Sequence, residues 1–126
     1  MATQTSLQNI VLSSISSREL TQLRANLEPV TLSFGEMLYQ PGERIRHVYF
    51  PIDCLISLLT VVDRRRSLEV GMVGNEGMAG MPFILGVGVS GVRALVQGAG
   101  AALRMEAGAF RTEFDRNSGL QQALYR

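Results

Sequence analysis

Nine of the 13 glycines lie between Gly71 and Gly100, and the first positive charge within this stretch is Arg93. Glycine adopts backbone torsions that other residues avoid and leaves its N–H group unobstructed. Together with a guanidinium, such N–H groups can bind a phosphate or another anion. Tight turns use glycine as well. The segment "GNEGMAGMPFILGVGVSGVRALVQ" (residues 74–97) therefore predicts either an anion-binding loop or a series of turns.

The sequence contains few residues that could bind a metal, undergo redox chemistry or act in covalent catalysis. The chain has one cysteine, Cys54, and one histidine, His47, whereas an iron–sulfur cluster usually needs four thiolates and a zinc site three or four ligands. We interpret Cys54 as a small buried residue and His47 as a partly exposed structural residue, and expect neither haem nor an iron–sulfur cluster. All 12 basic residues are arginine, which excludes lysine-based catalysis. No carboxylates form a recognisable catalytic pair, so we expect no enzymatic activity.

Composition limits the class of protein. A chain of 126 residues, 46% of them hydrophobic, can form one ordinary core. Its net charge of +1 and the lack of a basic stripe indicate that it does not bind nucleic acid by itself. A single cysteine fits a reducing cytoplasm. The longest apolar run, residues 54–62, is too short to cross a membrane, so we expect a cytoplasmic protein without a membrane partner.

The elements that would position the glycine segment can be inferred from hydrophobic periodicity. Residues 7–27 have helical spacing, with Ser16 or Ser17 as an N-cap, and Pro29 closes this part. Val30, Leu32 and Phe34 then alternate with polar residues, as in a strand. Turns are expected at residues 35–36 and 41–42. Further strands are expected at residues 47–50, 54–62, 67–73, 93–97 and 101–105.

Residues 54–73 form a predicted hairpin around the charged tip "DRRR". The continuous apolar run of its first strand favours burial on both faces. In the second strand, Leu68, Val70 and Met72 face the same way. The three arginines at the tip are interpreted as solvated charges that discourage pairing with another chain. Helical spacing returns at Phe110 and Phe114 and again over residues 119–126.

Three segments, taken in order, resemble one known family. "FGEMLYQPGERIRHVYFPIDCLISLL", "GNEGMAGMPFILG" followed by "RALVQ", and "LRMEAGAFRTEF" are similar to the cyclic-nucleotide-binding-like sensor domain of the Crp/Fnr bacterial transcription regulators. The resemblance implies a mainly β fold, a double-stranded β-roll of the jelly-roll type with flanking α-helices. It implies N-terminal helices in residues 1–28, the roll in 29–106, and C-terminal helices in 107–126 that begin the dimerisation helix. The helix-turn-helix domain of the family is not in this chain.

The resemblance also places a ligand cassette in the glycine segment. In relatives that bind cyclic AMP, the cassette resembles "GEL…RSA", in which Gly and Glu hold the ribose and Arg holds the phosphate. The Gly position falls at Gly80, and Met81 takes the Glu position, where a thioether cannot replace a carboxylate. If Ala94 matches the motif's alanine, Val92 replaces the phosphate-binding Arg and Arg93 points to the opposite face. An alignment anchored at the other end of the loop restores Arg93; otherwise it is a solvent-facing charge on an edge strand.

The candidate ligand-binding residues are thus Gly77, Met78, Gly80, Met81, Arg93 and Ala94, and residues 82–85 are expected to form a short helix. The favoured function is the effector-sensing and dimer-forming domain of a Crp/Fnr-type regulator whose cyclic-nucleotide site is altered or absent. Two alternatives remain: a conventional cyclic-AMP-binding domain, and a stand-alone interaction module with a degenerate site. For the regulator we expect an unknown small-molecule effector and a homodimer at full length. DNA and RNA polymerase would be contacted through the complete protein, the polymerase in some relatives by the hairpin tip.

Overall fold

The computed structural model describes residues 9–80 and 91–124. Its helices are α2 (Ile10–Ser13), α3 (Ser17–Arg24), α5 (Ala107–Arg116) and α6 (Ser118–Leu124). Ser16 caps α3, as predicted, because its Oγ accepts from the N–H of Glu19 and satisfies a donor that the first turn leaves free. None of the helices in these two ranges is long and apolar enough to cross a membrane.

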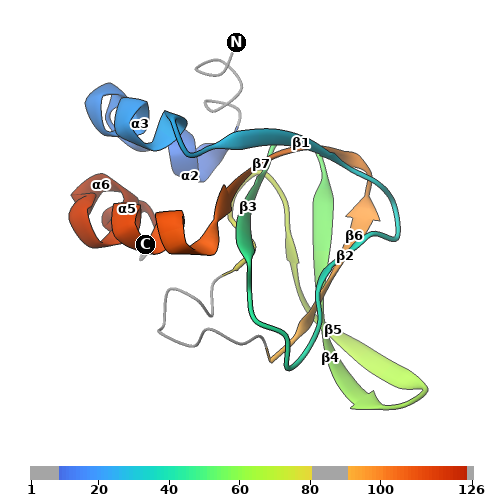
Figure 1. Ribbon diagram of the computed structural model, residues 1–126. Helices are drawn as coiled ribbons and strands as arrows, with labels where there is room; N and C mark the ends of the chain where they lie inside the picture. Colours follow the sequence, from blue (N-terminus) through green and yellow to red (C-terminus); the bar gives the residue numbers. More distant parts are fainter. Residues whose placement is uncertain (1–8, 81–90, 125–126) are drawn as a thin grey trace.

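Two antiparallel sheets form the body of the molecule (Figure 1). The three-stranded sheet has the order β1-β7-β3 and the four-stranded sheet the order β2-β6-β4-β5. The helices lie together on one side of the sheets, and the β4–β5 hairpin extends away from them (Figure 1). The predicted mainly β fold with flanking helices is confirmed. The strands are β1 (Glu28–Leu32), β2 (Met37–Tyr39), β3 (His47–Pro51), β4 (Leu55–Asp63), β5 (Arg66–Val73), β6 (Arg93–Gly98) and β7 (Gly100–Glu106).

Both predicted turns form, and each needs its glycine. The N–H of Glu36 donates to the carbonyl of Ser33, with Gly35 at a φ of 84°. The N–H of Glu43 donates to the carbonyl of Gln40, with Gly42 at a φ of 86°. A positive φ at the third residue is what a type II turn requires.

The prediction that the β4 strand is buried on both faces is wrong for its second half. Val61 and Val62 are 42% and 47% exposed, and across the hairpin Leu68 and Val70 are about 60% exposed. The physical reason is that the hairpin extends beyond the body of the roll: β6 pairs with β4 only along residues 55–59, whereas β4 continues to Asp63 (Figure 1). Among the described residues, the core between the two sheets includes no hairpin side chain between Leu58 and Val73, so these apolar side chains stay in solvent.

Buried side chains form two clusters, one on each face of the β1-β7-β3 sheet. The first cluster packs Val48, Phe50 and Met105 against the helices, including Phe110 of α5. The second cluster lies between the two sheets and has the following members: Leu32, Tyr39, Tyr49, Cys54, Ile56, Ala79, Ala94, Val96 and Ala102. Burying apolar area on both faces makes this sheet the structural centre of the chain.

Candidate functional site

The first residues of the glycine segment are fixed to the N-terminal helices. The side-chain amide of Asn9, which is fully buried, donates to the carbonyls of Pro51 (2.6 Å) and Gly77 (3.1 Å). Its Oδ1 accepts from the N–H of Leu12 and caps α2. One side chain therefore joins α2, the end of β3 and the candidate residue Gly77, and the sequence pattern gave no signal for this role of Asn9.

The next two residues enter different cores. Met78 is buried in the first cluster, among the helices, while Ala79 is buried in the second cluster, inside the roll. Ala79 also forms a two-bond antiparallel bridge with Tyr49, with N···O distances of 2.8 and 2.9 Å. The segment thus crosses from one core to the other within two residues.

Gly80 occupies a position that no other residue fits. Its φ is +118°, and a Cβ at this place would lie 2.6 Å from Cγ1 of Val48. Both the torsion and the close approach to β3 exclude a side chain. Gly80 is thus explained by its backbone geometry. Met81 and the predicted helix at residues 82–85 lie outside the described residues.

Ala94 and Arg93 point to opposite faces of β6. Ala94 is fully buried in the second cluster, and Val92, which has the same parity, packs against that cluster too. Arg93 is half-buried and faces away from it. The interpretation of Arg93 as a charge on an edge strand is wrong, because β6 lies between β2 and β4. The structure brings both Gly80 and Ala94 next to Tyr39, whereas Arg93 faces away from the second cluster.

Tyr39 connects these two residues. It pairs with Ala94 across β2 and β6, and its phenol oxygen receives a backbone hydrogen bond from Gly80. Burial raises the pKa of Tyr39 to about 12, against the opposing effect of that hydrogen bond. The phenol is therefore protonated at neutral pH and keeps an O–H donor in the core.

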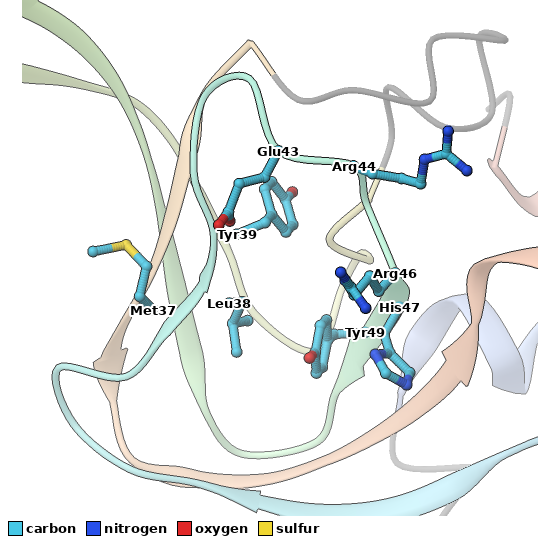
Figure 2. A pocket seen from close by; sticks show the side chains of 8 residues that line it. All are labelled: Met37, Leu38, Tyr39, Glu43, Arg44, Arg46, His47 and Tyr49. Atoms are coloured by element: carbon cyan, nitrogen blue, oxygen red, sulfur yellow. The ribbon is translucent and has the colours of Figure 1, made fainter.

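A cavity of about 350 Å³ opens beside Tyr39 and Tyr49 (Figure 2). Its walls come from β2, the loop at residues 40–46 and the start of β3. Tyr49 is bonded to Ala79 through its backbone, and the phenol of Tyr39 receives a hydrogen bond from Gly80. A molecule in this cavity would therefore touch the two residues that hold Ala79 and Gly80. The cavity is lined by Met37, Leu38, Tyr39, Glu43, Arg44, Arg46, His47 and Tyr49.

The electrostatics of the cavity wall depend on Arg104 of β7. Its Nε donates to Glu28 Oε1 at 2.7 Å, which lowers the pKa of Glu28. Burial raises the pKa of Tyr49, although a hydrogen bond from Arg104 opposes this. Burial and the charge of Arg104 lower the pKa of His47, so this imidazole is neutral at pH 7.

The arrangement is suited to binding. The cavity offers neutral phenols, a neutral imidazole and the guanidinium groups of Arg44 and Arg46, which can donate hydrogen bonds to a polar or anionic ligand. Among residues 9–80 and 91–124, no three His, Cys, Asp or Glu side chains come together as metal ligands. Burial raises the pKa of Cys54, which is 2% exposed and matches the predicted small buried residue. Sequence reasoning missed the two tyrosines; the alternation in "HVYF" was the available signal for Tyr49.

Two antiparallel sheets closed into a roll, with helices at one side and a glycine segment crossing between the cores, define a cyclic-nucleotide-binding-like domain. This is the fold that the sequence resemblance implies, and solved structures confirm it. No family model matches the sequence, and no curated protein matches it either.

Three similar structures illustrate the range of proteins with this fold. The N-terminal domain of a transcriptional regulator from Streptomyces coelicolor A3(2) is 19% identical, with a TM-score of 0.72 over 96% of this chain and 85% of that one. The sensor domain of the transcriptional regulator DNR from Pseudomonas aeruginosa is 15% identical, with a TM-score of 0.73 over 95% and 85%. A mutant regulatory subunit of a cAMP-independent protein kinase A from Trypanosoma brucei, bound to cAMP in its A site, is 14% identical, with a TM-score of 0.73 over 97% and 48%. This chain spans about half of that subunit.

Proposed function

We propose that this chain is the effector-sensing domain of a Crp/Fnr-type transcription regulator and that its effector is not a conventional cyclic nucleotide. The observation that carries the proposal is the orientation of β6. Val92 packs against the core on the same face as Ala94, which is the position where the resemblance requires the phosphate-binding Arg. Arg93 faces the other way. An uncompensated phosphate inside an apolar core would be strongly disfavoured.

The packing of the glycine segment supports a sensing mechanism. Met78 contacts the core formed by the helices, and Ala79 contacts the core of the roll. A ligand that prefers one arrangement of this segment would shift the population of helix positions relative to the roll. In the complete regulator, a homodimer would transmit this shift to DNA-binding domains and to RNA polymerase.

The structural neighbours support both parts of the proposal. Two of them are sensor domains of transcriptional regulators and match 85% of their own length. The Trypanosoma subunit is described as cAMP-independent, and the form bound to cAMP is a mutant. The same fold therefore occurs in a protein that does not depend on cyclic AMP.

Calorimetric titration of the purified chain with cyclic AMP and cyclic GMP tests the proposal. We expect no heat of binding at micromolar concentrations. A micromolar Kd for either nucleotide would contradict the proposal and favour a conventional cyclic-AMP-binding domain.

A double variant, Val92→Arg with Met81→Glu, makes the same experiment sharper. Val92→Arg restores the phosphate-binding cation on the same face as Ala94, and Met81→Glu restores the carboxylate that the family uses for the ribose. We therefore expect measurable cyclic AMP binding. The matched control is Val92→Leu with Met81→Gln, which alters size at the same positions without adding charge. Equal behaviour of the folded double variant and its control would contradict the placement of the site.

A further inference from the structure

A second pocket lies at the outer face of the four-stranded sheet, where the hairpin tip meets the start of β6. We call it the arginine pocket; it encloses about 190 Å³ and is lined by Val61, Asp63, Arg64, Arg65, Arg66, Ser67 and Arg93. Three of its four arginines are neighbours in sequence, but Arg93 comes from a different strand. Arginines from two elements therefore line this pocket because of the fold, and not only because of a charged run of sequence.

Arg93 has an unused donor in this pocket. Its Nε is buried and has no hydrogen-bond partner among the described residues. A buried donor without a partner destabilises the folded state unless an acceptor reaches it. The pairing of Arg93 with Leu59 fixes its side chain on the outer face, away from the roll interior that holds Ala94.

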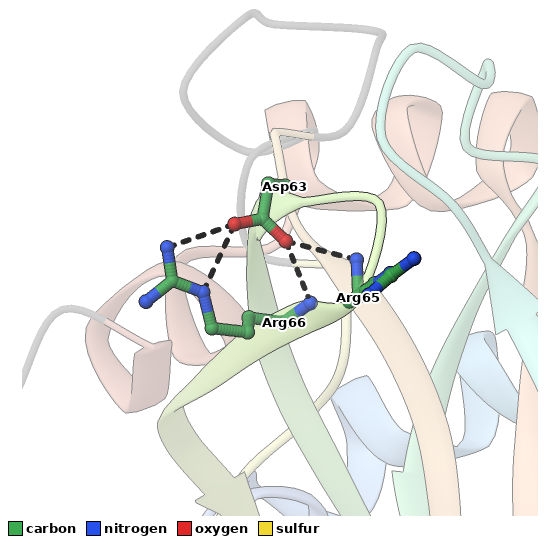
Figure 3. Close-up of polar contacts among 3 residues, drawn as sticks. All are labelled: Asp63, Arg65 and Arg66. Atoms are coloured by element: carbon green, nitrogen blue, oxygen red, sulfur yellow. Dashed lines mark hydrogen bonds and ion pairs between the residues drawn. The ribbon is translucent and has the colours of Figure 1, made fainter.

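The one carboxylate among the residues that line the pocket, Asp63, already accepts hydrogen bonds from the hairpin tip. Asp63 Oδ1 accepts from the backbone N–H groups of Arg65 (2.9 Å) and Arg66 (3.0 Å), and Oδ2 accepts from Arg66 Nε (2.9 Å) and pairs with Nη2 (2.8 Å). Figure 3 shows the guanidinium of Arg65 pointing away from this carboxylate. These bonds lower the pKa of Asp63, so it stays ionised and offsets Arg66 alone.

The remaining arginines leave the pocket with excess positive charge. Besides Asp63, the same face carries the carboxylate of Glu69, which lies beyond Leu59 from Arg93 and accepts from Ser57 Oγ at 2.7 Å. Arg64, Arg65 and Arg93 thus carry three charges that no ion pair within residues 9–80 and 91–124 offsets.

We propose that the arginine pocket binds a phosphate-sized anion, such as the terminal phosphate of a small phosphorylated molecule, with Arg93 as the central ligand. The pocket is smaller than the roughly 300–1,000 Å³ of sites that enclose a whole small molecule, so it suits one phosphate group. Guanidinium groups bind phosphate oxygens in a bidentate manner, and once the side chain of Arg93 turns toward the pocket, its buried Nε would gain the partner it lacks. The site is on the opposite face of β6 from the cassette and does not depend on the proposed function.

Titration of the full chain with pyrophosphate, followed by the NMR signals of the arginine Nε–Hε groups, tests the proposal. We expect a saturable shift of the Arg93 signal. Arg93→Gln should weaken pyrophosphate binding by about tenfold or more, because a charge-assisted hydrogen bond is lost. Arg65→Gln, at the exposed tip, should weaken it less and leave the fold intact. Arg18→Gln, which removes an exposed charge from α3, is the matched control and should change the affinity less than twofold.

Three results would overturn the proposal. One is an unshifted Arg93 signal at saturating pyrophosphate. Another is equal affinity of the Arg93→Gln, Arg65→Gln and Arg18→Gln variants. The third is Arg93-dependent binding of a short DNA duplex without binding of pyrophosphate, which would assign the pocket to a nucleic-acid backbone. If Arg93→Gln fails to fold, the Arg65→Gln variant and the wild-type signal still decide the matter.

Discussion

Gly80 carries two constraints at once, and other glycines of the chain allow them to be separated. Its φ is +118°, and an added Cβ would lie 2.6 Å from Val48. Gly35 has a positive φ of 84° with open space around it, and Gly91 has neither constraint. We expect Gly80→Ala to reduce the free energy of unfolding by about 3 kcal/mol or more, through torsional strain and overpacking together.

The two control variants isolate the causes. Gly35→Ala should cost about 1–2 kcal/mol through torsion alone, and Gly91→Ala should stay within about 0.5 kcal/mol of wild type. Urea unfolding measures all three. Equal losses for Gly80→Ala and Gly35→Ala would show that the contact with Val48 contributes nothing.

The absence of lysine makes the alkaline titration of this protein unusually simple. Tyrosines and Cys54 are the side chains that ionise between pH 8 and 12, since all 12 basic residues are arginine. In the folded state the pKa of Tyr39 is about 12, against 10.0 for an exposed phenol. The raised value stabilises the folded state below pH 10, and this contribution is lost as the pH rises from 10 to 12.

We therefore expect the free energy of unfolding to fall between pH 10 and 12, by on the order of 2 kcal/mol for Tyr39. The shift of Tyr49 is in the same direction and adds to the slope. In Tyr39→Phe, the free energy of unfolding should fall clearly less between pH 10 and 12. Below pH 9, neither protein should show this dependence on pH. Urea titrations at fixed pH values measure it, and an unchanged slope in Tyr39→Phe would contradict the assignment.

At the scale of elements, the short helix α2 is stabilised mainly by the side chain of Asn9. It has four residues, too few to be stable alone. Asn9 caps it and also donates to Pro51 and Gly77. Asn9→Ala should lower the free energy of unfolding by about 2–4 kcal/mol, because it removes a cap and leaves two buried carbonyls without their partner.

Ser16→Ala is the matched control for this prediction. Ser16 caps α3 from an exposed position, and within residues 9–80 and 91–124 its hydroxyl bonds to Glu19 alone, so its loss should cost about 1 kcal/mol. Chemical denaturation compares the two variants. A cost of Asn9→Ala no larger than that of Ser16→Ala would mean that the bonds to Pro51 and Gly77 add nothing to the cap.

Local patterns predicted most strands and the N-cap of α3, but not how far each strand is covered. Alternation at Leu68 and Val70 indicated a strand correctly, yet both side chains are exposed because this part of the hairpin extends beyond the core between the two sheets. The three-residue strand β2 was missed, since a register shift at Met37 and Tyr39 interrupts its pairing. Such effects depend on partner strands that are distant in sequence. For the same reason, the sequence could place Arg93 on a strand without revealing that β6 is central.

At the scale of the whole molecule, adjacent residues link the two cores. Met78 packs among the helices, and Ala79 packs inside the roll and bridges to Tyr49. Two cores joined in this way should unfold as one cooperative unit. The chain contains no tryptophan, and its third tyrosine is Tyr125. In a Tyr125→Phe background, tyrosine fluorescence therefore reports on the roll through Tyr39 and Tyr49, while far-ultraviolet circular dichroism reports mainly on the helices.

Met78→Ala tests whether the segment transmits a change in one core to the other. The substitution leaves a cavity in the helical core and should cost about 2–4 kcal/mol, whereas Met37→Ala, at a side chain 40% exposed, should cost less than about 1 kcal/mol. If the cores are coupled, urea unfolding of Met78→Ala shifts the fluorescence and circular dichroism midpoints together. A shift confined to the circular dichroism signal would show that the roll unfolds independently, and the segment could not then carry a ligand's effect from the roll to the helices.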